Sequence, residues 1–259
     1  MSLQCVVLAG GMGTRMRPFT ESCPKTMLPV AGRPFAEHQL EFLIQGGVTD
    51  VVYLIGYRGE AVRDHFGDGA KWGVRIRYVD EGATLRGTAG ALRLALHHGV
   101  LAPSFLLIYG DSFTPIGIRG VWAAFQGSSM PALMTVLCNR ERWDCSNVVY
   151  EEGRIVIYDK TRQDPQMHHI DYGLSALRRE VVEEMIPDSV PADLSTVFHR
   201  LSLEGRLAGF EASERFYEIG SPAGLRDFER YIAEIRDSTL NHHFLDGRSL
   251  PELPVENGD

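Results

Sequence analysis

A glycine-rich loop that carries two arginines follows the first apolar run of this chain. The run Gln4 to Leu8 leads directly into AGGMGTRMRP, residues 9–18. Three glycines let the backbone approach an anion closely and turn its N–H groups toward that anion. Thr14 can donate a further hydrogen bond, and Arg15 and Arg17 supply positive charge. The loop therefore predicts a polyphosphate site.

The spacing of the loop separates it from two common phosphate-binding fingerprints. The dinucleotide pattern needs G-x-G-x-x-G, and the Walker loop needs G-x-x-x-x-G-K-[ST]. Here Gly10, Gly11 and Gly13 lead to Thr14 and Arg15 with no adjacent lysine. A nicotinamide enzyme and a P-loop NTPase are therefore disfavoured.

A second motif, PKTMLPV at residues 24–30, brings a lysine close behind the loop. Of the 26 lysines and arginines only Lys25, Lys71 and Lys160 are lysine, which indicates that a compact ammonium is needed where one is kept. Lys71 is better explained as a solvated surface charge. Together, residues 8–18 and 24–30 resemble the signature of the sugar-1-phosphate nucleotidylyltransferases, which make nucleotide-sugars from a nucleoside triphosphate and a sugar phosphate.

A carboxylate follows the apolar run that ends at Tyr109. Gly110 and Asp111 come directly after it, and the ligands of open α/β sheets bind beyond the carboxyl ends of the strands. Mg²⁺ prefers one or two carboxylates together with phosphate oxygens and water. By itself, such an aspartate more often caps a helix or starts a turn. The family has a metal-binding aspartate after this strand, so the resemblance implies that Asp111 holds Mg²⁺.

The resemblance also implies a second metal ligand in the C-terminal part. Residues 216–222, FYEIGSP, lie where the family has an aspartate followed by an apolar residue and Gly-Thr-Pro. Glu218 takes the position of that aspartate, and its longer side chain changes the distance between a bound metal and the backbone. Ser221 and Pro222 are predicted to cap and begin the helix that follows.

Three further motifs resemble the substrate side of the family. Residues 157–160, IYDK, match its strand-borne Glu-Lys segment, with aspartate in the place of glutamate. Residues 171–174, DYGL, match the Asn-Ala-Gly-Ile segment that lines the sugar pocket. Asp171 and Tyr172 then imply a pocket altered in charge and bulk. Residues 87–88 correspond to a glycine-containing turn near base and ribose.

The resemblance implies in-line attack of the sugar phosphate on the α-phosphorus of the triphosphate, so catalysis depends on positioning and charge neutralisation. Arg15 would neutralise the departing pyrophosphate, Lys25 would bridge the two reacting phosphates, and Lys160 would hold the sugar phosphate. The expected nucleotide contacts are Leu8, Ala9, Gly10, Gly11, Gly13, Thr14, Glu81, Gly87 and Thr88, and the expected sugar-phosphate contacts are Gly110, Lys160, Asp171, Tyr172 and Gly173. Mg²⁺ is expected on Asp111 and Glu218.

The identity of the base depends on the stretch YVDEG, residues 78–82, which carries acids where uridylyl and thymidylyl enzymes commonly have glutamine. A carboxylate can accept hydrogen bonds from both N1–H and the 2-amino group of guanine, whereas uracil and thymine offer one N–H. Glu81 therefore favours guanine if it points inward, and a solvated loop acid is the alternative.

Overall similarity is greatest to the guanylyltransferases that act on heptose or mannose 1-phosphate in bacterial surface-polysaccharide pathways. This implies GTP and D-glycero-D-manno-heptose or mannose 1-phosphate as substrates. The alternatives are a uridylyl-, thymidylyl- or cytidylyltransferase for another sugar 1-phosphate, and a non-catalytic nucleotide-sugar-binding regulatory protein. Some family members form dimers or tetramers, so a homo-oligomer is compatible with the resemblance.

The composition of the chain limits the kinds of partner that it is expected to bind. With 259 residues, 44% of them hydrophobic, the chain can bury a large core. A net charge of −8 disfavours long nucleic acids, and no apolar run approaches the roughly 18 residues of a membrane span. The N-terminus lacks the pattern of a secretory signal, so we expect a cytoplasmic protein with no membrane partner. The four cysteines show no C-x-x-C spacing, and adjacent histidine pairs diverge on helices and strands, so neither pattern predicts a zinc site.

The elements that must position these residues alternate between strand and helix patterns. The predicted strands are 4–8, 51–55, 74–78, 105–109, 132–138, 147–150, 155–158 and 170–176, and the predicted helices are 34–44, 58–66, 88–97, 178–185, 192–204 and 222–235. We therefore predict a Rossmann-like three-layer α/β/α fold with a mixed, mostly parallel sheet. Residues 1–237 are expected to form a single domain, and residues 238–259 a loosely held tail.

Overall fold

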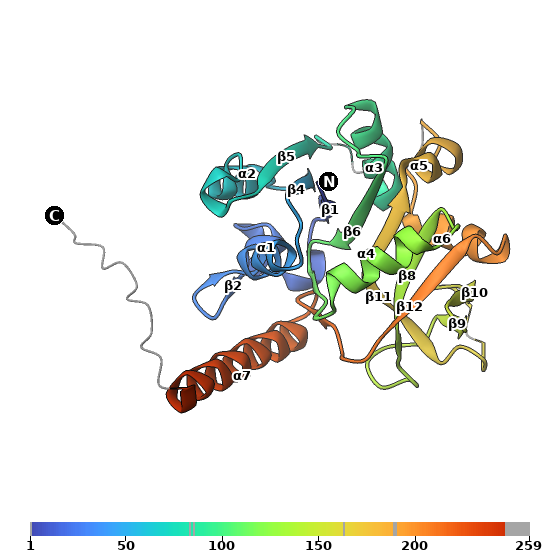
Figure 1. Ribbon diagram of the computed structural model, residues 1–259. Helices are drawn as coiled ribbons and strands as arrows, with labels where there is room; N and C mark the ends of the chain where they lie inside the picture. Colours follow the sequence, from blue (N-terminus) through green and yellow to red (C-terminus); the bar gives the residue numbers. More distant parts are fainter. Residues whose placement is uncertain (1, 83, 85, 163, 189–190, 247–259) are drawn as a thin grey trace.

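The computed structural model describes residues 2–82, 84, 86–162, 164–188 and 191–246, with side chains described as far as residue 236. Nine strands form one sheet in the order β5-β4-β1-β6-β11-β8-β12-β10-β9 (Figure 1). These strands are β1 (Gln4–Ala9), β4 (Asp50–Ile55), β5 (Arg75–Asp80), β6 (Ser104–Tyr109), β8 (Ala132–Cys138), β9 (Val148–Glu151), β10 (Arg154–Tyr158), β11 (His169–Arg178) and β12 (Leu207–Ala212).

The sheet is mixed: one half is entirely parallel, and the other half contains the reversed strands β11 and β10. Strands β5, β4, β1 and β6 are parallel. Strand β11 is antiparallel to both β6 and β8, β12 is parallel to β8, and β9 and β10 form a hairpin. The hairpin turns at Glu152 and Gly153, which both have positive φ, as a two-residue turn requires. This topology confirms the predicted Rossmann-like α/β class with a mixed sheet.

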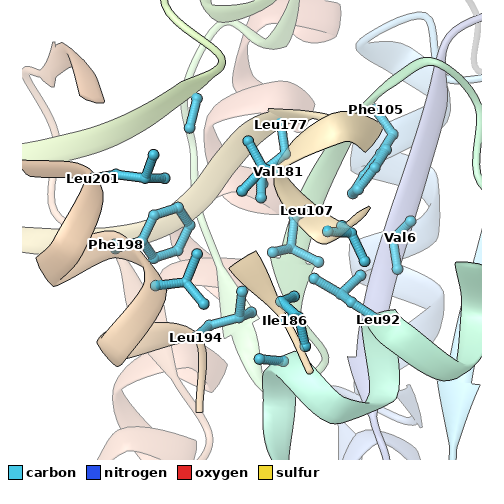
Figure 2. Close-up of a cluster of buried hydrophobic side chains, with 14 of the residues drawn as sticks. Val6, Leu92, Phe105, Leu107, Leu177, Val181, Ile186, Leu194, Phe198 and Leu201 are labelled. Carbon is cyan, nitrogen blue, oxygen red and sulfur yellow. The ribbon is translucent and has the colours of Figure 1, made fainter. Parts of the chain in front are cut away.

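Helices cover both faces of the sheet because successive side chains of a buried strand point to opposite sides. On one face, α3 (Gly87–His97), α5 (Arg179–Met185) and α6 (Leu194–Leu203) pack on alternate residues of the strands, such as Val6 and Leu107. Figure 2 shows this cluster, in which Leu92 from α3, Val181 from α5 and Phe198 from α6 meet over the strands.

The opposite face carries α1 (Phe35–Gln45), α2 (Glu60–Phe66) and α4 (Ile118–Gly127). These helices pack on the other set of strand residues, including Val7 and Ile108. Strands β1, β4 and β6 are therefore buried on both sides, which explains their continuous apolar character.

A third cluster supports the segments that follow β1. Phe228 and Ile232 from α7 (Pro222–Asp246) pack against Met16 and Phe113. Ser221 caps α7 as predicted, because the Gly224 N–H donates to its Oγ at 3.1 Å. The cluster includes Val30 of β2 (Pro29–Val30) and Phe113 of β7 (Ser112–Phe113), Tyr217 of β13 (Tyr217–Glu218) packs against it, and β3 (Arg33–Pro34) pairs with β2. The turns η1 (Thr14–Met16), η2 (Phe19–Glu21) and η3 (Lys25–Met27) lie between β1 and β2. A fourth such turn, η4 (Ala70–Trp72), precedes β5.

Some element boundaries differ from the prediction. Helix α2 begins at Glu60 because Arg58 has a φ of 53°, which a right-handed helix does not allow. Helix α4 and strand β12 have no counterpart among the predicted elements. Helix α7 continues to Asp246, beyond its predicted end at residue 235, and the predicted tail from 247 to 259 lies outside the described residues.

Candidate active site

The glycine loop opens into a narrow cavity at the carboxyl ends of β1 and β6. This cavity has a volume of about 240 Å³. It is lined by Leu8, Ala9, Gly10, Gly11, Lys25, Thr26, Glu81, Gly87, Thr88, Ala91, Tyr109, Gly110 and Asp111. Seven of the nine expected nucleotide contacts are among these residues. We call it the nucleotide-side cavity.

Close backbone contacts explain why glycine is needed in this loop. A Cβ on Gly10 would lie 2.0 Å from Glu81 Oε1, and a Cβ on Gly110 would lie 2.9 Å from the Leu8 carbonyl oxygen. Gly13 has a φ of 60°, where side chains are strained, and its carbonyl accepts from the Thr20 hydroxyl at 2.8 Å. The loop therefore turns tightly, and its backbone forms the wall of the cavity.

Glu81 points into the nucleotide-side cavity. Its Oε2 accepts a hydrogen bond from the Arg86 N–H at 3.0 Å, and its Oε1 faces Gly10. Burial raises the pKa of Glu81, while the hydrogen bond from Arg86 lowers it. One carboxylate oxygen is therefore fixed by the protein and the other lies beside the glycine loop.

Lys25 and Asp111 form an ion pair at the floor of the same cavity. Lys25 begins η3, after Pro24, and Asp111 follows β6. Both side chains are about four-fifths buried, with exposed fractions of 18% and 21%. The two groups predicted to contact phosphate and metal therefore neutralise each other here, and each can exchange its partner for an ion of the substrate complex.

Glu218 lies next to Asp111 through backbone pairing. Strand β13 pairs antiparallel with β7, which places Glu218 opposite Ser112, and the Ile219 N–H donates to the Asp111 carbonyl at 3.0 Å. Partial burial, followed by the negative charges of Asp111 and Asp171, raises the pKa of Glu218 to about 7. Glu218 retains solvent access, so a bound ion can reach it.

This pair of carboxylates fits a magnesium ion. Both donors are hard oxygens, which Mg²⁺ prefers. Burial first, and repulsion from Asp111 and Asp171 second, raise the pKa of Glu218, and a divalent cation would relieve that repulsion. Asp111 and Glu218 would hold the ion, and it would supply positive charge to phosphate oxygens.

A wider cavity of about 980 Å³ adjoins these carboxylates, and we call it the sugar-side cavity. It is lined by Arg15, Tyr109, Trp143, Asp144, Cys145, Ser146, Asn147, Asp159, Lys160, Thr161, Arg162, Ile170, Asp171, Gly173, Arg215, Phe216, Glu218, Gly220, Ser221, Ala223, Gly224 and Asp227. Its walls come from the ends of β10 and β11, the segment after β8 and the start of α7.

Lys160 and Asp171 form an ion pair in the lining of this cavity. Their Nζ and Oδ2 atoms are 3.8 Å apart, and Asp171 also accepts from the Tyr158 hydroxyl at 3.3 Å and from the Gly173 N–H at 3.0 Å. Burial raises the pKa of Asp171, whereas Lys160 lowers it. Gly173 has a φ of 94°, at an irregularity in the pairing of β11 with β8. This bend directs Asp171 toward the lysine.

Five expected contacts lie elsewhere or differently. Gly110, expected at the sugar phosphate, lines the nucleotide-side cavity and not the sugar-side cavity. Gly13 and Thr14 line neither cavity and instead form the turn into η1. Arg15 lines the sugar-side cavity, with its Nη2 near Gly220. Tyr172 departs most from the prediction, because it is fully buried and packs edge-on against the Phe216 ring at 5.6 Å. It points to the face of β11 opposite Asp171, as strand alternation requires.

Two other features were not predicted from the sequence. Tyr109 lines both cavities, and its position directly before Gly110 and Asp111 was the available signal. Arg215 lies over the Trp143 ring at 3.9 Å and over the Tyr217 ring at 4.6 Å. Trp143 and Arg215 are far apart in sequence, so only the fold reveals that both line the sugar-side cavity.

Comparison with known proteins agrees with this geometry. The sequence profile of the nucleotidyl transferase family matches residues 4–142, more than half of the chain. N-acetylmuramate alpha-1-phosphate uridylyltransferase from Neisseria meningitidis serogroup B is 40% identical over 231 residues, which cover 87% of this chain and 96% of that protein.

Two further relatives are more distant. Mannose-1-phosphate guanylyltransferase from Mycobacterium tuberculosis is 29% identical over 237 residues, covering 90% of this chain, but the chain spans only 64% of that protein's length. The solved structure of the inositol-1-phosphate CTP transferase from T. maritima superposes with a TM-score of 0.76 at 23% identity, covering 91% of this chain and 96% of that one. This structural likeness shows a shared fold.

Proposed function

Because this chain belongs to the nucleotidyl transferase family, we propose that it transfers a nucleoside monophosphate from a nucleoside triphosphate to a sugar 1-phosphate and releases pyrophosphate. The observation that carries this proposal is the junction of the two cavities. Lys25 and Asp111 lie on the nucleotide side of it, Glu218 and Lys160 lie on the sugar side, and Tyr109 lines both. Two phosphates bound in these cavities would meet at charged groups of the protein.

In this mechanism the chain's own residues orient and neutralise the reacting groups. Lys160 holds the phosphate of the acceptor sugar, and Lys25 leaves Asp111 to contact the α-phosphate that is attacked. Arg15 is exposed on η1 and supplies charge for the departing pyrophosphate. Asp111 and Glu218 would hold Mg²⁺, which would supply positive charge to the phosphate oxygens. No side chain forms a covalent bond to the nucleotide.

We propose GTP as the donor, and the position of Glu81 supports this choice. Its carboxylate lines the nucleotide-side cavity next to Gly10. A carboxylate there can accept from both N1–H and the exocyclic amino group of guanine, but from only one N–H of uracil or thymine. The mannose-1-phosphate guanylyltransferase relative is consistent with a guanine nucleotide.

For the acceptor we propose mannose 1-phosphate or D-glycero-D-manno-heptose 1-phosphate. The sugar-side cavity, at about 980 Å³, has room for a sugar larger than a hexose. Asp171, held by Tyr158 and Gly173, offers a buried acceptor for sugar hydroxyl groups.

A second candidate is a uridylyltransferase for an acidic sugar phosphate such as N-acetylmuramate 1-phosphate, the substrate named for the Neisseria relative. Arg162 and Arg215 both line the sugar-side cavity and could pair with a sugar carboxylate. A regulatory protein that binds nucleotide-sugars without turnover is the candidate from another class.

Pyrophosphate release with Mg²⁺ separates these candidates. GTP, UTP, dTTP, CTP and ATP are each tested with heptose, mannose, glucose, N-acetylglucosamine and N-acetylmuramate 1-phosphates. The proposal predicts release that requires GTP and a manno-configured acceptor. Release with UTP and N-acetylmuramate 1-phosphate would support the second candidate, and nucleotide-sugar binding without release would support the regulatory protein.

A further inference from the structure

Three side chains with metal-binding atoms meet on the sheet outside both cavities. They are Cys138 at the end of β8, His169 at the start of β11 and Glu211 near the end of β12. The Sγ, imidazole nitrogen and carboxylate oxygen atoms all lie within 4.8 Å of one another, and His169 Nε2 is 3.3 Å from Glu211 Oε1. Within the described part of the chain, no other trio of histidine, cysteine and acidic side chains comes this close.

The strand register places these three side chains on one face. Strands β11, β8 and β12 are neighbours in the sheet, as Figure 1 shows. Cys138 lies directly opposite His169, and Glu211 lies opposite Val136, which is two residues before Cys138. Opposite residues and residues two apart on a strand share a face of the sheet. The hydrogen-bonded backbone of three strands therefore fixes the positions from which the three metal-binding side chains extend.

The surroundings of these three side chains favour binding of a metal ion that enters from the solvent. The Tyr150 ring contacts the His169 ring edge-on at 5.1 Å and limits how the imidazole can turn. His169 is mostly buried, with 15% of its side chain exposed, while Glu211 is 47% exposed. An ion can therefore enter past Glu211 and meet a histidine that the protein already orients.

We propose that Cys138, His169 and Glu211 form a Zn²⁺ site with water as the fourth ligand. Thiolate and imidazole select zinc and similar transition metals over magnesium. Zinc takes tetrahedral nitrogen, sulfur and oxygen donors at about 2.0–2.3 Å, which places the ligands roughly 3.3–3.8 Å apart. Small side-chain rotations from the present spacing reach that geometry. The cysteine is deprotonated on binding, and its proton passes to the solvent.

This site is distinct from the proposed magnesium site but is linked to the sugar side. His169 lies two residues before Asp171 on β11, and its carbonyl accepts from the Asn147 N–H at 2.9 Å. Asn147 Oδ1 in turn accepts from the Asp171 N–H at 3.0 Å. Zinc would therefore tie β8, β11 and β12 together and stiffen the strand that carries Asp171.

Calorimetric titration of chelator-treated, reduced protein with Zn²⁺ in excess Mg²⁺ tests the proposal. We expect one equivalent to bind, and Co²⁺ to give a thiolate-to-cobalt charge-transfer band. Even outer-shell changes at metal sites cost about 10–100-fold in affinity, so Cys138→Ser and His169→Ala should each weaken Zn²⁺ binding by ~100-fold or more. Glu211→Gln, at an exposed position, should weaken it less.

Matched controls make either result decisive. Cys145→Ser removes an exposed cysteine outside the trio, and His168→Ala removes the neighbouring histidine, so both should keep the stoichiometry and the cobalt band. Asp111→Asn should keep them too, because it alters the proposed magnesium site and the ion pair with Lys25 but none of the three zinc ligands. Absence of a cobalt band in the wild-type protein, or a band that survives Cys138→Ser and is lost with Cys145→Ser, would overturn the proposal.

Discussion

The nucleotide side and the sugar side of this molecule recognise their ligands by different means. The nucleotide-side cavity is about 240 Å³ and is formed largely by glycines and the ends of parallel strands. The sugar-side cavity is about 980 Å³ and is lined mainly by charged and polar side chains from antiparallel strands and connecting segments. The family profile ends at residue 142, before β9 to β12, so it covers the first of these regions more than the second.

The difference shows which part of the site can vary. A cavity wall made of backbone, as at Gly10 and Gly110, tolerates few substitutions because an added methyl group meets other atoms. A wall made of side chains such as Lys160, Asp171 and Arg215 can change charge without altering the strands beneath it. We therefore expect chemistry to depend on the first region and acceptor choice on the second.

The largest effect is expected at the junction of the two regions. Asp111→Asn removes a predicted metal ligand and leaves Lys25 without its ion-pair partner. Loss of a group that positions charge at the reacting phosphates should lower kcat/KM by ~10³-fold. Steady-state pyrophosphate release measures this loss. Asp64→Asn, on the exposed face of α2, is the control and should have no effect; a loss below tenfold for Asp111→Asn would contradict the assignment.

Lys160→Met should weaken binding of the sugar phosphate and leave binding of the nucleotide nearly unchanged. A hydrogen bond to a charged group contributes about 1.5–3 kcal/mol, so the KM for the sugar phosphate should rise by ~10–100-fold. The KM for the nucleotide should stay within ~2-fold, because Lys160 lines only the sugar-side cavity. Lys71→Met on η4 is the matched control. An equal rise in both KM values would show that the cavities do not divide the substrates in this way.

Gly11→Ala tests the backbone-lined wall. A Cβ at Gly11 has nothing within 4 Å, so the fold should be unaffected and Tm unchanged. The methyl group would project into the nucleotide-side cavity and should raise the nucleotide KM by ~10-fold. Gly127→Ala, at the exposed end of α4 with equally open space, is the matched control. An unaltered nucleotide KM would place the phosphates away from this loop.

The smallest expected effect is a pH dependence of metal affinity. Glu218 has a pKa raised to about 7 and must be ionised to bind a cation. Apparent Mg²⁺ affinity should therefore rise by ~10-fold from about pH 6 to about pH 8 and then level off. Magnesium titration of activity at each pH measures this, and Glu218→Gln should abolish the rise. A profile in the wild-type protein that is flat over this range would exclude Glu218 as a ligand.

The raised pKa of Glu218 also makes folding stability fall as the pH rises, whereas the affinity for Mg²⁺ increases. Because the folded state holds this proton more tightly than the unfolded state, the contribution of Glu218 to stability is present below its ordinary pKa of 4.5 and is lost as the pH rises through 7. Magnesium binding at higher pH would restore that loss.

Prediction from the sequence succeeded where a short pattern determines structure by itself. Buried parallel strands such as β1 and β6 read as continuous apolar runs, and the glycine loop and the cap at Ser221 each follow from local backbone chemistry. Strand β12 was missed because Gly209 and Glu211 interrupt its apolar pattern, although pairing with β8 holds it in the sheet.

The sequence could not reveal contacts between residues that are distant along the chain. The orientation of Tyr172 depends on the alternation of β11, and the stack of Arg215 on Trp143 depends on how two segments meet. The Cys138, His169 and Glu211 cluster comes from three separate strands, so no spacing rule for zinc sites could detect it.

The most direct test of the division between the two sides is the ratio of kcat/KM for GTP to that for UTP, measured in the wild-type protein and in Glu81→Gln with a single acceptor. Replacing the carboxylate by an amide removes one of the two acceptor contacts to guanine and leaves a partner for uracil. We predict that the ratio falls by ~10-fold or more, while the KM for the acceptor is unchanged. An unchanged nucleotide ratio, or a shift that appears in the acceptor KM instead, would contradict the assignment of base recognition to the nucleotide-side cavity.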